Sequence, residues 1–381
     1  MAAELQIEVV KADQLTVADR VLWRAMVEAN PDLASPYFRW EFTEIAARIS
    51  PDAAVAILSQ GGKTIGYFPH QRRGSAIQPL GAPMNDYHGV IAMPGEAPSL
   101  ATVAQLLNAP RLNVSAWVGP SGVGELRETL MTVTPEEGYD AWYAERRTTW
   151  GKYFKDKERA RRSLETELGP IRVERGIRDP ELLDVLIQLK RDQYARTNRH
   201  DIFACGWTRD LLHALMASEH EDFGASMAAL WAGDRLTAIE YSLHAGDRYH
   251  FWFPAYVPEL ARCSPGILLT MDTMRLGCAA GFRVFDFGFG GEGYKKYFCN
   301  ATQSVREAVI LRPGVGAMLS DAAVGLLNSA GNGKGERIRT SVRRRWAAIE
   351  ACEVTPANRL MGAVAAAGAA MKKVSGARHA A

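Results

Sequence analysis

The sequence predicts an α+β fold made of two halves, followed by a helical, basic C-terminal tail. Short apolar runs joined by tight-turn residues indicate antiparallel strands, stretches of helical periodicity lie between them, and a dense basic segment at 146–162 separates two such groups. With 381 residues, 47% of them hydrophobic, the chain is long enough for two domains. We place the halves at residues 1–150 and 151–313, and the tail at 314–381.

The charge balance and the cysteines restrict the class of protein. The 45 Lys and Arg against 43 Asp and Glu leave a net charge of +2, so no strong overall field favours nucleic acid, and we expect no DNA partner. Five scattered cysteines without a C-x-x-C pair are typical of reduced thiols in the cytoplasm. Because no targeting segment or spanning apolar run is recognisable, we expect a cytoplasmic protein, with peripheral binding at the inner membrane face left open.

The N-terminal half begins with a strand and helices and continues as strands. The expected elements are a strand at 7–10, a helix at 18–28 and a second helix in SPYFRWEFTEIAARI after the Ser35-Pro36 start signal. The segment 54–70 is a hairpin, because two apolar runs flank Gly61-Gly62. Further short strands extend to Trp117.

The C-terminal half predicts helices around an antiparallel meander. A strand at 171–174 precedes helices at 179–195 and 208–218. The segment 226–256 holds three strands, because AGDR occurs at both turns and carries the Gly-Asp of a tight hairpin. After it come a helix, a strand and short helix in FDFGFGGEGYKKYF, and a last strand at 304–312.

The basic segment Lys152–Arg162 is a helix candidate that we expect to cross between the halves. Such a run is either a solvated face or a track for the phosphates of a substrate or cofactor.

The order of elements resembles the GNAT acyltransferase fold. SPGILL, followed about twenty residues later by GFRVFDFGFGGEGYKKYF, is similar to the CelD/BioF2-like branch of that superfamily, which is related to the FemAB peptidoglycan transferases. NPDLASPYFRWEF and MNDYHGV are similar to the N-terminal signatures of that branch, and the resemblance covers about residues 5–312.

The resemblance implies a tandem GNAT-like fold and an acyl-CoA-dependent N-acyltransferase without a metal. Acetyl-CoA or another acyl-CoA is the expected co-substrate, and an amino sugar or polysaccharide precursor in extracellular polysaccharide biosynthesis is the expected acceptor. Two alternatives remain open. One is FemAB-like aminoacyl transfer, and the other is a regulatory or interaction module on a GNAT scaffold.

The helix start at RCSPGILL is the candidate coenzyme loop. A helix N-terminus offers backbone amides and partial positive charge to a pyrophosphate. Pro265 offers no N–H, and a routine helix start is the alternative interpretation. By resemblance, the coenzyme-binding residues are Arg262, Ser264, Gly266, Ile267 and Leu268.

Acyl transfer to an amine needs a base, an oxyanion site and an acid for the leaving thiolate. Glu240 is the carboxylate within an otherwise apolar strand and is our candidate base, with His244 and His250 as rivals. By resemblance Tyr294 is the acid. Asp286 is the third catalytic candidate, because it can orient a substrate amine or Lys295, or else pair with Arg283.

The acceptor candidates come from both halves. Trp252 and Tyr249 can line a groove, since aromatic faces stack on sugar rings, and a polar loop can reach the acceptor from the first half. Core packing is the alternative for each of them. The predicted substrate-binding residues are Asp86, Tyr87, His88, Trp252 and Lys295.

The tail contains RIRTSVRRRW after a flexible linker at 331–337. Arginines bind phosphates bidentately, so Arg339, Arg343, Arg344 and Arg345 are candidates for an anionic partner, either cyclic di-GMP or an anionic membrane surface. A solvated basic helix is the alternative interpretation.

Overall fold

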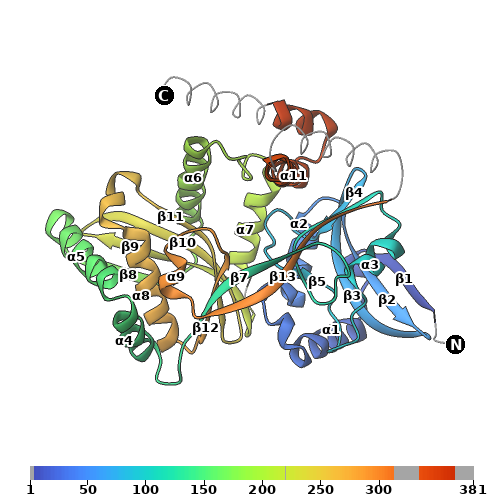
Figure 1. Ribbon diagram of the computed structural model, residues 1–381, viewed down its shortest axis with the longest axis horizontal. Helices are drawn as coiled ribbons and strands as arrows, with labels where there is room; N and C mark the ends of the chain where they lie inside the picture. Colours follow the sequence, from blue (N-terminus) through green and yellow to red (C-terminus); the bar gives the residue numbers. More distant parts are fainter. Residues whose placement is uncertain (1–3, 219, 313–333, 365–381) are drawn as a thin grey trace.

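The computed structural model describes residues 4–218, 220–312 and 334–364, and the side chains of the last segment from residue 342 onward. Helices and strands alternate in two halves, as Figure 1 shows, so the predicted α+β fold class is confirmed. Within the described residues, no helix has the length and apolar character needed to cross a membrane.

The first group of elements is rich in strands. The strands are β1 (Leu5–Val10), β2 (Ala53–Gln60), β3 (Lys63–Arg73), β4 (Ala76–Pro79), β5 (His88–Gly89), β6 (Arg111–Val118) and β7 (Glu125–Val133). The helices are α1 (Val17–Ala29), α2 (Trp40–Ile49) and α3 (Leu100–Leu107), with short 3-10 helices η1 (Ala12–Gln14), η2 (Pro31–Leu33) and η3 (Pro36–Phe38).

The second group contains more helix. The helices are α4 (Tyr139–Thr149), α5 (Gly151–Leu168), α6 (Pro180–Thr197), α7 (Trp207–Ala217), α8 (Pro265–Ala279), α9 (Lys295–Phe298) and α11 (Lys334–Cys352), with the 3-10 helix η4 (Pro258–Cys263). The strands are β8 (Ile171–Ile177), β9 (Phe223–Ala232), β10 (Arg235–Ala245), β11 (Arg248–Tyr256), β12 (Val284–Phe289) and β13 (Ala301–Leu311).

The strands form one sheet that runs through both halves. Its order is β1-β2-β3-β4-β6-β13-β7-β12-β11-β10-β9-β8, with β5 beside β6. Most neighbours are antiparallel, whereas β4–β6, β5–β6 and β11–β12 are parallel. The last strand, β13, lies between β6 and β7, and β7 pairs with β12. The two halves therefore exchange strands, and a division at residue 150 stays a prediction.

The expected meander is confirmed. Strands β9, β10 and β11 are antiparallel, and Gly233 and Gly246 in the two AGDR turns have φ angles of 55° and 53°. One expected helix begins later than predicted. Pro36–Phe38 forms η3, and Arg39 is extended, so α2 starts at Trp40. This break buries the ring of Tyr37.

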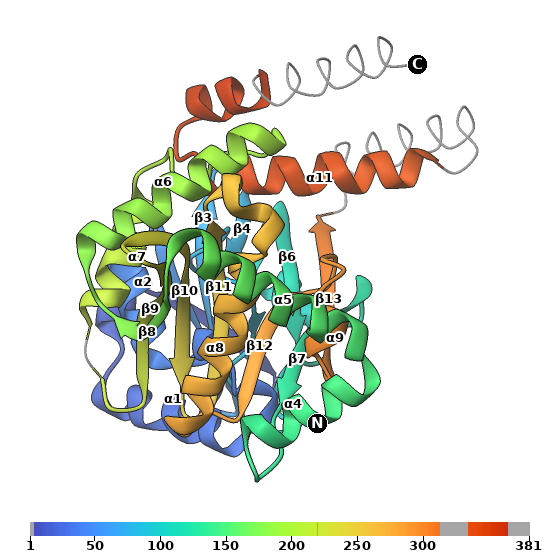
Figure 2. The ribbon, with the colours of Figure 1, turned by 90° about the vertical axis from the view of Figure 1, so that its left-hand side faces the viewer.

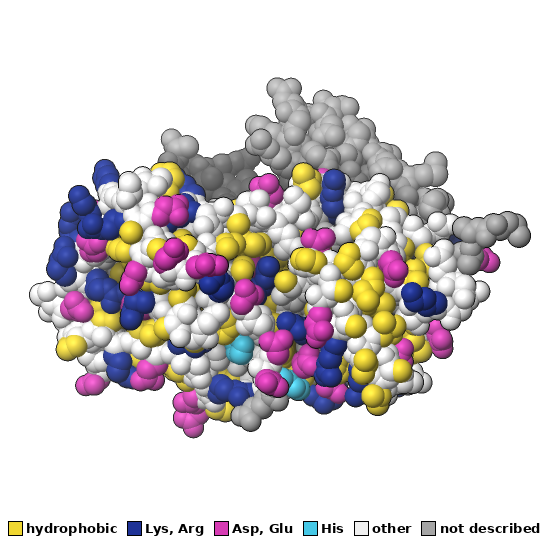
Figure 3. All heavy atoms as spheres, turned by 90° about the horizontal axis from the view of Figure 1, so that it is seen from below, with side chains coloured by type: hydrophobic (Ala, Val, Ile, Leu, Met, Phe, Trp, Pro, Cys, Tyr) yellow, Lys and Arg dark blue, Asp and Glu magenta, His cyan; other side chains and the backbone are white. Residues whose placement is uncertain are grey.

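The predicted crossing of the basic segment between the halves is wrong. The chain breaks near Trp150 into α4 and α5, and α5 packs on α8, η4 and β9 of the C-terminal half (Figure 2). Phe154 and Leu164 are fully buried, so this helix has an apolar stripe that docks it. Figure 3 shows Lys and Arg side chains gathered at the end of the molecule where α5 lies.

Helix α11 joins both halves. Arg73 Nε of β3 donates to Ala351 O at 3.1 Å, and Trp207 Nε1 of α7 donates to Cys352 O at 3.1 Å. Ile349, Ala351 and Cys352 are buried. Because these anchors come from both halves, this part of the tail is a docked helix.

Candidate active site

Strands β11 and β12 form a fork. They pair at three consecutive positions, of which the last is His250 opposite Asp286. Beyond that position β11 continues to Tyr256 and β12 to Phe289 without pairing to each other. His250 and Asp286, the last paired residues, lie at the vertex of the fork. Beyond them the separated strands have backbone groups that need other partners.

Three charged side chains form a relay at this vertex. The buried imidazole of His250 lies between two carboxylates, with Nε2 at 3.0 Å from Asp86 Oδ2 and Nδ1 at 3.4 Å from Asp286 Oδ2. Tyr87 Oη donates to Asp286 Oδ1 at 2.9 Å, and Arg248 Nη1 lies 3.8 Å from Asp286 Oδ2. Asp286 is fully buried, whereas 34% of the Asp86 side chain is exposed. Asp86 is thus the end of the relay that reaches solvent.

The two carboxylates keep His250 charged. Burial alone lowers the pKa of His250, but the charge of Asp286, whose Oδ2 lies 3.4 Å from Nδ1, and the hydrogen bond and charge of Asp86 outweigh it and raise the pKa to about 9. Burial likewise raises the pKa of Asp286, but the charge of His250, the hydrogen bond from the Gly288 amide and the charge of Arg248 hold it below its ordinary value. At neutral pH the centre is an imidazolium between carboxylates.

The glycine-rich FGFGG stretch turns the chain beside this relay. Gly288 has a φ of 64°, and its N–H donates to Asp286 Oδ1 at 2.8 Å. A Cβ there would contact His250 Cε1 at 3.7 Å and Asp86 Oδ2 at 3.9 Å. The left-handed backbone favours glycine and turns the chain around the Asp286 carboxylate.

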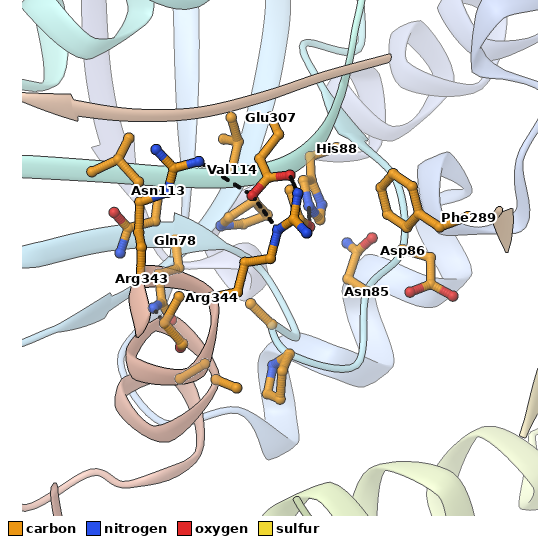
Figure 4. Close-up of a pocket in the computed structure, with 18 residues that line it drawn as sticks. Gln78, Asn85, Asp86, His88, Asn113, Val114, Phe289, Glu307, Arg343 and Arg344 are labelled. Atoms are coloured by element: carbon orange, nitrogen blue, oxygen red, sulfur yellow. Dashed lines mark hydrogen bonds and ion pairs between the residues drawn. The ribbon is translucent and has the colours of Figure 1, made fainter. Parts of the chain in front are cut away.

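A cleft of about 270 Å³ leads to Asp86 from the junction of the halves. Figure 4 shows Asp86 and Phe289 at one end and Arg343, Arg344 and Glu307 at the other. The polar side chains in the rest of the lining are Gln78 and Asn113 beside Arg343, Asn85 and His88 nearer Asp86, and Ser115. Apolar side chains make up the rest of the lining, so the cleft suits a ligand that has both polar groups and an apolar face.

Two lysines bind the backbone where the strands have separated. Lys295 Nζ of α9 donates to the carbonyls of Phe287 and Phe289, both at 2.6 Å, and Lys190 Nζ of α6 donates to Pro254 O at 3.3 Å. Burial and the charge of Arg199 lower the pKa of Lys190 to about 8. The predicted substrate residue Lys295 therefore lies at the fork and also pairs with Glu292.

The predicted base and acid lie on the other face of the sheet. Glu240 of β10 is buried beside Thr273 of α8, and burial raises its pKa to about 8. Burial is also the main cause that raises the pKa of Tyr294, and the charge of Glu240 contributes to it. The three predicted catalytic residues are thus divided between two faces of the sheet, because Asp286 belongs to the relay and Glu240 and Tyr294 do not.

The candidate coenzyme loop lies at the start of α8, under the basic helix. Arg262 is exposed and pairs with Glu167, and Lys157 Nζ donates to Ser264 Oγ at 2.8 Å. Ser264 has a φ of 50°. The amides of the next two predicted residues, Ile267 and Leu268, bond back to Ser264 O at 3.0 and 3.2 Å, and Leu268 is buried in the core.

Gly266 is the open position of this loop. A Cβ added there would approach Tyr256 Cδ1 at 3.6 Å, an ordinary contact. The assignment of the loop to coenzyme binding stays a prediction.

The remaining predicted acceptor residues are mostly structural. Tyr87 holds Asp286, and Trp252 is buried against Tyr37. His88 lines the cleft, and its Nε2 lies 2.8 Å from Ser115 Oγ. Burial lowers the pKa of His88 to about 3, so its ring is neutral.

The tail arginines with described side chains have partners within the chain. Arg344 donates to Glu307 Oε1 and Oε2 at 2.8 and 2.6 Å, and Arg343 Nη2 to Oε1 at 3.4 Å. Arg345 Nη2 donates to Asn198 O at 2.8 Å. The side chain of Arg339 lies outside the described ones. Cyclic di-GMP or membrane binding by this tail stays a prediction.

Sequence reasoning considered His250 only as a rival base and did not connect it to Asp86. The signal in the sequence was indirect, since MNDYHGV and FDFGFGG each carry one aspartate of the relay. Their pairing depends on the contact between the halves.

Comparison with known families identifies the kind of domain at this site. Residues 129–296 match the sequence model of the acetyltransferase (GNAT) domain, a stretch that runs from β7 to α9 and includes the fork. The chain therefore carries a GNAT acetyltransferase domain, and the predicted enzyme class, a GNAT-type N-acyltransferase, is confirmed. The CelD/BioF2-like branch is a finer assignment that this match does not reach.

Several solved structures are similar to this chain at low sequence identity. FemX is 12% identical with a TM-score of 0.47, covering 79% of this chain and 95% of its own. A tandem GNAT protein from the clavulanic acid pathway is 9% identical with a TM-score of 0.44, covering 82% and 100%. The C-terminal domain of a candidate lysylphosphatidylglycerol synthetase from Agrobacterium fabrum is 13% identical with a TM-score of 0.47, covering 81% and 96%. No curated protein sequence matches this chain.

Proposed function

We propose that this chain transfers an acyl group from an acyl-CoA, in the first place acetyl-CoA, to the amine of an amino sugar or related precursor for extracellular polysaccharide. The observation that carries the proposal is the relay of Asp86, His250 and Asp286. It stands at the vertex of a strand fork and ends in a polar cleft. Donor and acceptor can meet at that point from two directions.

The fork suits the acyl donor. Where β11 and β12 separate, an extended chain with amide groups can pair with the strand backbones, as the pantetheine arm of coenzyme A can. The start of α8 lies just beyond β11, beside Lys157 of the basic helix, and the positive charge of this lysine supports a pyrophosphate there. Lys190 and Lys295 are already at the separated strands.

The relay suits the acceptor. Asp86 attracts an ammonium group in the cleft and takes one proton from it as the amine nitrogen bonds to the thioester carbonyl carbon. The carbon–sulfur bond then breaks as the nitrogen gives up its second proton to water, and coenzyme A leaves as a thiolate that takes up a proton. Tyr294 remains the predicted donor of that proton and is reprotonated from water. His250 and Asp286 act as positioning residues, since their charges fix the Asp86 carboxylate.

The test is acetyl transfer to a panel of amines, read as release of the coenzyme A thiol. We expect release with glucosamine and other amino sugars, and little release with amino acids. If acetyl-CoA binds in calorimetry but no amine in the panel causes release of the thiol, the proposed reaction is contradicted.

A further inference from the structure

Positive charge exceeds negative charge around Glu307, which lines the cleft together with Arg343 and Arg344. Three arginines, Arg127 of β7 and Arg343 and Arg344 of α11, contact the single carboxylate of Glu307. Among the side chains that the structure describes, three cations against one anion around Glu307 leave two positive charges. The exposed Glu125, whose charge also acts on Arg344, reduces the excess to one.

Docking of α11 does not account for this excess. The helix is already held by Arg73 and Trp207 at its C-terminal end and by the ion pair of Arg111 with the buried Glu350. Glu307 would be neutralised by one arginine, and Arg344 alone binds both of its oxygens. The additional charge is therefore available for a second anion.

Buried polar atoms in the cleft point to the same conclusion. The amide nitrogens of Gln78 and Asn113 donate to α11, at 3.4 Å each, but Gln78 Oε1 and Asn113 Oδ1 are buried without a hydrogen-bond partner among the described residues. Both side chains line the cleft and are more than nine-tenths buried. Unpaired acceptors of this kind are costly unless a ligand donates to them.

We infer that the cleft binds an amine that also carries a phosphate group, with the phosphate on Arg343 and Arg344 and the amine at Asp86. This inference rests on the proposed function and names its acceptor more closely. A surplus of one to two positive charges matches a phosphate monoester, and the amide oxygens match sugar hydroxyls. Arg344 binds Glu307 through Nε and Nη2 and is 48% exposed, so its outer edge faces the ligand. Helix α11 thus forms one wall of the acceptor site.

The experiment compares glucosamine with glucosamine 6-phosphate in wild type, Arg344→Gln and the control Arg345→Gln. Arg345 belongs to the same helix but donates to Asn198 O outside this cleft. We expect the wild type to prefer glucosamine 6-phosphate, and Arg344→Gln to raise its KM at least about tenfold, the loss expected for a charged hydrogen bond. Glucosamine itself and the control variant should show little change. Equal KM values for the two amines, or equal effects of both variants, would overturn the inference.

Two further arms separate the possible outcomes. Calorimetry with glucosamine 6-phosphate needs no transfer, so weaker binding to Arg344→Gln without acetylation by wild type would support the phosphate site and contradict the proposed reaction. Vesicles of phosphatidylethanolamine present an amine beside a lipid phosphate. If these vesicles are acetylated and Arg344→Gln weakens that transfer, the site is supported and its phosphate belongs to a lipid headgroup.

A third variant tests the charge directly. Glu307→Gln, which releases all three arginines, should tighten phosphate binding, and weaker binding would count against the inference.

Discussion

Replacing His250 with glutamine removes the central charge of the relay, and the structure sets the size of the effect. The pKa of His250 is about 9 in the folded chain, against an ordinary value of 6.5. Because the folded pKa is raised, the stabilisation is complete below pH 6.5 and is lost as the pH rises through 9. The difference of about 2.5 between the pKa values corresponds to ~3 kcal/mol of unfolding free energy.

The assay is urea unfolding of wild type and His250→Gln at pH 6 and pH 9.5. We expect the variant's deficit in unfolding free energy to be smaller at pH 9.5 than at pH 6 by ~3 kcal/mol. Glu240 also loses stabilisation with rising pH, between 4.5 and about 8, but it is present in both proteins and cancels in the comparison. The imidazole signal of His250, assigned by its absence in the variant, should titrate near pH 9. A deficit independent of pH, or titration near 6.5, would refute the charged relay.

Three other predictions follow from the same structure. Arg262→Ala should weaken acetyl-CoA binding in calorimetry. An unchanged affinity would contradict the assignment of coenzyme binding to this loop. Tyr294→Phe should lower turnover by ~10² or more with unchanged acetyl-CoA affinity, whereas Glu240→Gln should keep turnover; a large loss in the latter would return the base to Glu240. Leu164→Ala should destabilise the chain by ~2–5 kcal/mol in urea unfolding, because Leu164 is fully buried, while Leu126→Ala, 59% exposed in wild type, should change little.

Local sequence signals predicted much of the fold. The AGDR turns fixed the meander, and the apolar run after Pro265 predicted α8, because hairpins and helices depend on neighbouring residues. The insertion of β13 between β6 and β7 could not be predicted in this way. Its partners lie about 170 to 200 residues away in the chain, so no local pattern records the pairing.

The candidate site was predicted in pieces. Asp86 and Asp286 were both named, but the sequence separation of 164 between Asp86 and His250 kept the relay from being recognised. Strand alternation left the face of Glu240 undecided, and the structure turns it toward α8. The function of the basic tail was predicted from its arginines alone. In the structure the buried residues Ile349, Ala351 and Cys352 dock this helix on the rest of the chain.

The most direct test of the proposed reaction is single-turnover acetyl transfer by Asp86→Asn, with Asp13→Asn, on η1 away from the cleft, as the control. Asp86 is the relay member exposed to the cleft, so its loss should lower the rate of transfer by ~10² to 10⁴ while acetyl-CoA affinity stays the same. The control should match wild type. Transfer by Asp86→Asn at the wild-type rate would contradict the assignment of the relay as the site of acyl transfer.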